Sequence, residues 1–128
     1  MGEVHMSKLL KYTFLIHALV ALVLGAGLLL APGRTLDIFR WAPQDALITR
    51  LFGAALLAFA WSSFRGWQSD SFEKVATLVE MEVVFTVFGC VGLLRHLIKG
   101  VYPAIVYAVF ALLLVFAVLW VISLVRRK

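Results

Sequence analysis

The stretch that decides the fold is Leu9–Leu30, LLKYTFLIHALVALVLGAGLLL, in which Lys11 and His17 are the only ionisable side chains apart from Tyr12. About 20 mostly apolar residues in helical form cross the roughly 30 Å hydrocarbon core of a bilayer. Three further stretches reach the same length. The sequence therefore predicts an integral membrane protein with four spanning helices, the other three at Ala46–Phe64, Val75–Leu97 and Tyr102–Val125.

The overall composition fits only the membrane class of proteins. Hydrophobic residues make up 63% of the chain and charged residues 15%, whereas soluble domains average about half and a quarter. The net charge of +5 is placed at the helix ends, which favours contact with lipid headgroups and argues against nucleic-acid binding. Cys90 is the one cysteine, so no intramolecular disulfide or cysteine metal site can form, and we expect no cofactor or metal.

Short connections between the spans predict an all-α, up-down-up-down four-helix bundle in one domain covering residues 6–128. Residues 1–5 are interpreted as a vector-derived leader, because His5-Met6 is typical of a cloning junction. Both termini then share one side of the membrane. That side carries seven basic residues and the opposite side five, which favours both termini on the cytoplasmic side of the cell (inner) membrane. The seven are Lys8, Lys11, Arg65, Lys74, Arg126, Arg127 and Lys128; the five are Arg34, Arg40, Arg50, Arg95 and Lys99.

The longest connection lies between the first two spans. Its segment Arg34–Trp41 alternates basic and apolar residues between two prolines and predicts a short helix in the headgroup layer; an irregular loop is the alternative. We assign Arg34, Arg40 and Trp41 to the membrane interface. Arg50, one turn into the second span, is assigned there too, reaching headgroups or capping the preceding loop.

Close packing of small residues is expected to hold the helices together, since lipid tails are as apolar as leucine. Each span carries such residues, for example Ala21 and Gly25 on the first and Gly89 and Gly92 on the third. A monomeric bundle and an oligomer would both use this pattern, so the sequence leaves the two open.

Ionisable residues within the spans predict a polar cluster. His17 and Glu80 each lie six residues inward from a lysine, about 9 Å along a helix, and Glu82 lies about 3 Å deeper. A charge at this depth costs about 2.5–3.5 kcal/mol and needs a partner or a role. We predict that Glu82 points into the bundle toward His17 or a hydroxyl such as Thr13 or Ser62, that Glu80 lies nearer water, and that Trp61 lies at a similar level.

The cluster has two interpretations. As a functional site, His17, Glu80, Glu82 and Trp61 would bind a proton or a ligand. As a structural network, the same residues would hydrogen-bond between helices, with the outer acid reaching water.

The motifs Lys8-Leu-Leu-Lys-Tyr, His17-Ala-Leu-Val-Ala-Leu-Val-Leu-Gly, Leu29-Leu-Ala-Pro and Arg50-Leu-Phe-Gly-Ala-Ala-Leu-Leu-Ala together resemble small, uncharacterised four-span bacterial membrane proteins of a loosely DoxX-like kind. The resemblance implies a four-helix bundle and carries over no catalytic residue.

The sequence thus favours a small non-enzymatic membrane protein that acts through helix–helix contacts, as an accessory subunit or homo-oligomer in the lipid bilayer. The alternative is a small proton-coupled transporter or lipid- or ligand-binding protein that uses the His17–Glu82/Glu80 cluster. No nucleophile–base constellation, phosphate loop or metal-ligand spacing points to an enzyme.

Overall fold

The predicted all-α bundle is confirmed by a computed structural model, which describes residues 4–126. Four of its helices are long and apolar enough to cross a membrane. A short helix lies between the first two of them. The helices are α1 (Lys8–Leu30), α2 (Pro32–Ile38), α3 (Ala46–Trp67), α4 (Ala76–Leu97) and α5 (Ala104–Val125).

Local chemistry sets where the long helices begin. The Ser7 hydroxyl accepts a hydrogen bond from the amide of Leu10 and starts α1, and the Asp45 carboxylate caps α3 in the same way. Pro103, which has no amide hydrogen to leave unpaired, immediately precedes α5. By contrast, α4 begins without a side-chain cap.

The short helix differs in its bounds from the predicted Arg34–Trp41. It starts two residues earlier, at Pro32, and ends three residues earlier, at Ile38. Proline is favoured in the first turn of a helix, and Arg40 ends the helix by adopting a left-handed conformation, with φ of 52°. The amide of Trp41 then donates to the Leu36 carbonyl over 2.9 Å, the bond expected of a Schellman C-terminus.

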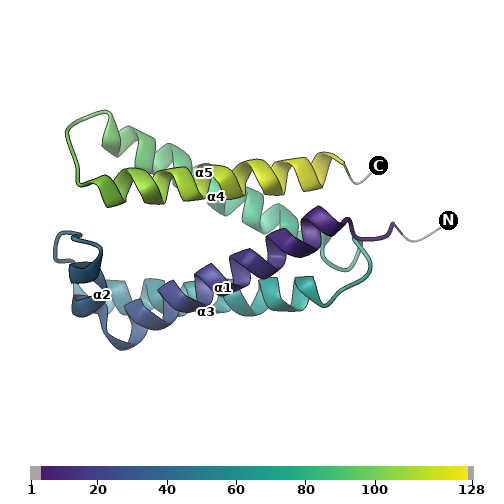
Figure 1. Ribbon diagram of the computed structural model, residues 1–128, viewed down its shortest axis with the longest axis horizontal. Coiled ribbons are helices and arrows are strands. Elements are labelled where there is room, and N and C mark those ends of the chain that lie inside the picture. The colour runs from purple at the N-terminus through teal and green to yellow at the C-terminus, as the bar shows by residue number, and fades with distance from the viewer. Residues whose placement is uncertain (1–3, 127–128) are drawn as a thin grey trace.

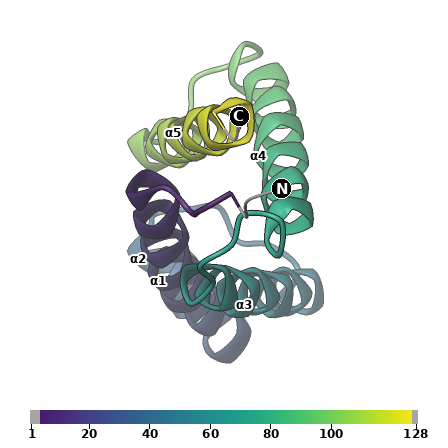
Figure 2. The ribbon, with the colours of Figure 1, turned by 90° about the vertical axis from the view of Figure 1, so that its right-hand side faces the viewer.

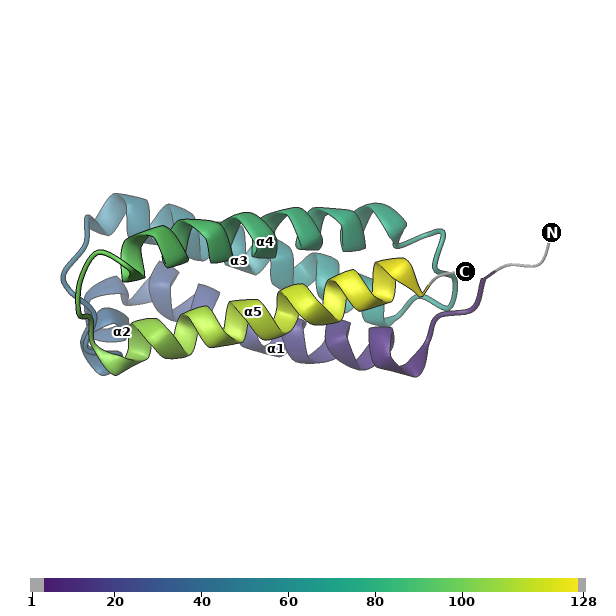
Figure 3. The ribbon, with the colours of Figure 1, turned by 90° about the horizontal axis from the view of Figure 1, so that it is seen from above.

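The long helices form two antiparallel hairpins. Helix α1 packs along α3, and α4 packs along α5; α1 and α5 make a smaller contact, and α3 and α4 make the smallest contact among the neighbouring long helices. Figure 1 shows the hairpins converging toward the end that carries both termini and separating toward the opposite end, where α2 lies. The end-on view in Figure 2 and the view from above in Figure 3 show the same paired arrangement.

The main core sits at the end of the bundle that carries the termini. It joins residues of α1, α4 and α5 with two from the connection between α3 and α4, and it includes the fully buried ring of Trp120. The hairpins are therefore held together mostly in this half of the molecule. The core residues are Leu10, Phe14, Phe72, Val75, Val79, Phe116 and Trp120.

The outer surface of the helices is apolar. Large side chains such as Val23, Leu30 and Phe88 are more than two-thirds exposed, and a soluble monomer rarely carries extensive apolar patches of this kind. Together with the four long apolar helices, this surface identifies a multi-pass membrane protein.

The first described residues run beside the connection between α3 and α4. The amide of Met6 donates to the Asp70 carbonyl, the amide of Phe72 donates to the Val4 carbonyl, and His5 faces Ser71 in an antiparallel bridge. The interpretation of residues 1–5 as a vector leader stays a prediction; residues 1–3 lie outside the described part of the chain, as do the two basic residues at 127 and 128.

Candidate functional site

A buried carboxyl group on α4 is the centre of the site. Glu82 is 0% exposed and shares one helix face with Val79 and Thr86, because residues three and four apart lie above one another on a helix. The Thr86 hydroxyl donates to the backbone carbonyl of Glu82 over 2.7 Å. Its hydrogen bond is therefore made within α4, and the Glu82 carboxyl group must find its partners on other helices.

Partners for Glu82 come from α1 and α3. Its Oε1 lies 3.4 Å from the Ser63 hydroxyl, which donates to it, and 3.5 Å from Nδ1 of His17. The same Nδ1 lies 2.8 Å from Oγ of Ser63. His17, Ser63 and Glu82 thus form one polar cluster that joins three helices, and the prediction that Glu82 points inward toward His17 is confirmed.

Aromatic rings from α5 and α1 enclose the polar cluster. The imidazole of His17 meets the edges of Phe116 and Trp120, with ring centroids 4.9 and 5.6 Å away. Phe14 stacks edge-on against Trp120 at 4.9 Å. Because Ser63 and Glu82 are fully buried, the cluster is closed to solvent and to the lipid surface in this conformation.

The chemistry open to the cluster is proton sharing. An isolated charge inside a membrane protein is costly, and one shared proton can reside on the His17 ring or on the Glu82 carboxyl group while the pair stays neutral overall. The Ser63 hydroxyl, in contact with both, can accept from one and donate to the other. Within the described residues, Glu82 Oε2 and the indole N–H of Trp120 are buried without a hydrogen-bond partner, so the site keeps one unused acceptor and one unused donor.

Two of the predicted site residues do not join this cluster. Glu80 lies two residues from Glu82, about 200° around the helix, and is exposed, as expected for the outer acid. Trp61 is 66% exposed and points away from the bundle, with its ring centroid 6.1 Å from that of Phe64. Whether either of them serves a ligand or proton site stays a prediction.

Ser63 belongs to the polar cluster and Trp120 encloses it, although the prediction from the sequence included neither residue. Thr13 and Ser62, the hydroxyls it favoured, bond to backbone carbonyls of their own helices. A usable signal existed for Ser63, since it shares the buried face of α3 with the small residues Ala60 and Gly66. The signal for Trp120 was weaker, because α5 is almost uniformly apolar and only Ser123, three residues further along, marks the same face.

The predicted interface residues lie at the end of the bundle that carries α2. Arg34 and Arg40 are exposed, and Trp41 is half-buried just after α2. Arg50 donates a hydrogen bond of 2.7 Å to the Leu29 carbonyl, one of the last carbonyls of α1, where a cation is favoured by the helix dipole. Arg50 was predicted to reach headgroups or cap the preceding loop; in the structure it caps the end of α1 itself.

A metal centre has no support among residues 4–126, where no group of three histidine, cysteine or acidic side chains is close enough to hold an ion. Cys90 is half-buried within α4.

No family model matches the chain, and no curated protein or solved structure matches it significantly either.

Proposed function

We propose that this is a small non-enzymatic membrane protein that acts through helix–helix contacts, with the polar cluster fixing how its two hairpins meet. The observation that carries the proposal is the hydrogen bond from Ser63 to Glu82. It links α3 to α4, which make the smallest contact among the neighbouring long helices. A buried polar contact of this kind favours one packing arrangement over its competitors.

The proposed partners are other transmembrane helices, either in a larger membrane complex or in a second copy of the chain. The long helices carry apolar outer faces, such as that of Leu19, Val23 and Leu30 on α1. A face of this kind is open to a neighbouring helix. The mass of the purified protein in detergent, compared with the 14.3 kDa chain, distinguishes a monomer from an oligomer.

The proposed location is the cell (inner) membrane, with both termini on the cytoplasmic side. Its support is the excess of basic residues at the end of the bundle that carries the termini. A reporter that functions only in the cytoplasm should be active when fused after residue 128, and a reporter that functions only in the periplasm should be inactive there. From its motifs, the chain is also proposed to be related to the loosely DoxX-like proteins that they resemble.

The role of the polar cluster is tested by two substitutions at one position. Glu82→Gln keeps hydrogen-bonding groups of the same shape, so the variant should unfold close to wild type. Glu82→Leu removes the acceptor of the Ser63 hydroxyl, leaves Ser63 and His17 with only each other, and should lower the free energy of unfolding by about 1–3 kcal/mol. Thermal unfolding in detergent measures both.

The matched control is Glu80→Leu, which makes the same chemical change on the exposed side of α4. It should cost less than Glu82→Leu. Equal stability of Glu82→Leu and wild type would contradict a structural role for the cluster.

A second candidate function is proton-coupled transport or ligand binding at the same cluster. It is favoured by the two buried atoms with unused hydrogen-bonding capacity, Glu82 Oε2 and the Trp120 indole N–H, because native interiors rarely leave such groups without a reason. In proteoliposomes, a pH jump should then produce a charge movement in wild type and none in Glu82→Gln. If wild type shows no charge movement, proton coupling is ruled out.

A further inference from the structure

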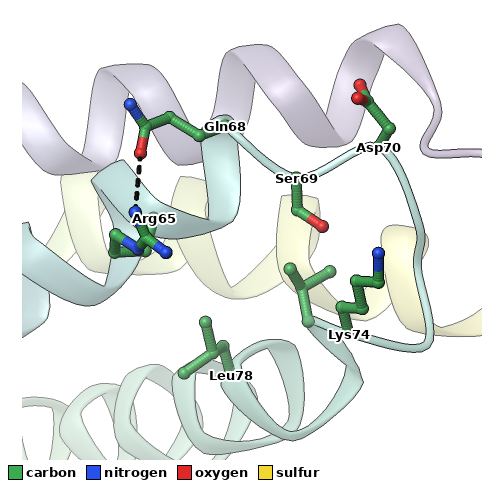
Figure 4. Close-up of a pocket in the computed structure, with 7 residues that line it drawn as sticks. Arg65, Gln68, Ser69, Asp70, Lys74 and Leu78 are labelled. Carbon is green, nitrogen blue, oxygen red and sulfur yellow. Dashed lines mark hydrogen bonds between the residues drawn. The ribbon is translucent and has the colours of Figure 1, made fainter.

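A cavity separate from the polar cluster opens at the end of the bundle that carries the termini. It encloses about 460 Å³ between the last turn of α3 and the first turn of α4. Arg65 and Lys74 stand on opposite sides of it, and Leu78 lies at its floor (Figure 4). We call it the headgroup pocket; its lining is Arg65, Gln68, Ser69, Asp70, Lys74, Val75 and Leu78.

The charges around the headgroup pocket leave it with free cationic groups. Lys11 forms an ion pair with Asp70. Its hydrogen bond and charge, with a smaller contribution from the charge of Lys74, hold the pKa of Asp70 below the ordinary value. In the described part of the chain, the Arg65 guanidinium donates only to the neutral side chain of Gln68, over 3.3 Å. Within residues 4–126, Lys74 forms no ion pair with a carboxylate.

The one further acid of this connection is turned to a different partner. The carboxylate of Glu73 accepts a hydrogen bond from the Ser71 hydroxyl over 3.4 Å. Among the described residues that line the pocket, Asp70 is the one carboxylate; it is ion-paired with Lys11, outside the lining, and Lys74 acts on it only through a weaker charge interaction. Arg65 and Lys74 therefore both face the pocket without an ion-pair partner of their own in the described part of the chain. This arrangement is complementary to a single anionic group.

The depth of the headgroup pocket matches the boundary between hydrocarbon and headgroups. It lies where α3 ends, at Trp67, and where α4 begins. The rings of Trp61, Phe64 and Trp67 form a ladder on the outside of α3, with successive centroids 6.1 and 5.8 Å apart, and such aromatic side chains concentrate at the membrane–water interface. Leu78 gives the pocket an apolar side that faces toward the membrane interior.

We propose that the headgroup pocket binds the phosphate of an anionic phospholipid, held between Arg65 and Lys74 with the acyl chains leaving past Leu78. Arginine suits the bidentate recognition of a phosphate, and lysine binds it as a point charge. The site would tie one lipid molecule to the connection that joins the two hairpins. This inference does not depend on the role of the polar cluster.

The test is native mass spectrometry of the full chain in detergent, titrated with dioleoylphosphatidylglycerol or dioleoylphosphatidylcholine. Wild type should retain one phosphatidylglycerol in preference to phosphatidylcholine. The double variant Arg65→Gln/Lys74→Gln should weaken phosphatidylglycerol binding by roughly 30-fold, and Lys74→Gln alone by roughly fivefold, as expected for two and one juxtamembrane basic groups.

The matched control is Lys8→Gln/Arg126→Gln, which removes the same charge from exposed positions at the same end of the molecule. It should keep the lipid preference of wild type. An equal loss in this control would mean a diffuse electrostatic attraction and would overturn the proposal, as would a wild type without preference for phosphatidylglycerol.

Inorganic phosphate provides the last arm of the experiment. In excess, it should fail to displace phosphatidylglycerol, since it makes no use of the apolar side of the pocket. Efficient displacement would show a site for a soluble anion and would overturn the lipid assignment. If the double variant does not fold in detergent, as judged by thermal unfolding, the single variant Lys74→Gln decides the outcome.

Discussion

Helices α1 and α3 approach each other closely at two glycines, and the substitution Gly53→Ala should force them apart. A Cβ atom built at Gly53 lies 2.6 Å from the backbone nitrogen of Leu29 and 2.9 Å from the carbonyl oxygen of Gly25. Both obstacles are backbone atoms of α1, so no side chain can rotate away to make room. A Cβ at Gly25 meets the Gly53 carbonyl oxygen in the same way, also at 2.9 Å.

The size of the effect follows from the distance the helices must move. Ordinary contacts of a Cβ begin near 3.4 Å, so the crossing point must open by roughly 0.8 Å, and a gap of 0.5–1 Å loses a quarter to a half of each dispersion contact. Overpacking of this kind costs about 1–3 kcal/mol. We expect Gly53→Ala to lower the free energy of unfolding by an amount in that range.

The matched control is Gly92→Ala in α4, where the added methyl group meets no atom within 4 Å. Alanine is a better helix former than glycine by up to about 1 kcal/mol, so this variant should be as stable as wild type or slightly more so. Unfolding of both variants in detergent, followed by circular dichroism, gives the comparison. A Gly53→Ala protein as stable as Gly92→Ala would refute the close approach of α1 and α3.

Three further predictions concern polar groups at the two ends of the bundle. Arg50→Ala removes the hydrogen bond to the Leu29 carbonyl and should cost about 1 kcal/mol in thermal unfolding, whereas an unchanged melting temperature would show that water replaces it. Arg40→Gly relieves the left-handed backbone conformation at that residue and should stabilise by about 1 kcal/mol; a loss of stability would mean that the arginine side chain contributes more than its backbone costs. The ion pair of Lys11 with Asp70 lowers the pKa of Asp70, so its stabilisation is present at neutral pH and lost as the pH falls below about 4. The difference in melting temperature between wild type and Asp70→Asn should therefore vanish below that pH. A difference that persists in acid would refute the assignment.

Much of the candidate site could be anticipated because depth along a helix is fixed by residue number. Counting from Lys11 and Lys74 placed His17 and Glu82 at similar levels, and the cost of an unpaired carboxylate at that depth required a partner. The choice of Ser63 over Ser62 could not follow from depth, since adjacent residues differ in direction by about 100° around the helix. That choice depends on which face of α3 meets α1, a property of the packed bundle.

Sequence alone determined the class of the protein, the number of spans and the ends of the helices to within a few residues. It did so because the bilayer sets the span length, and because prolines, glycines and capping residues act locally. Only the tertiary structure decided which helices pair, that α3 and α4 make the smallest contact among the neighbouring long helices, and that Trp120 of α5 encloses the polar cluster. The physical reason is that a helix such as α5, apolar along almost its whole length, carries only a weak pattern to distinguish a face toward lipid from a face toward protein.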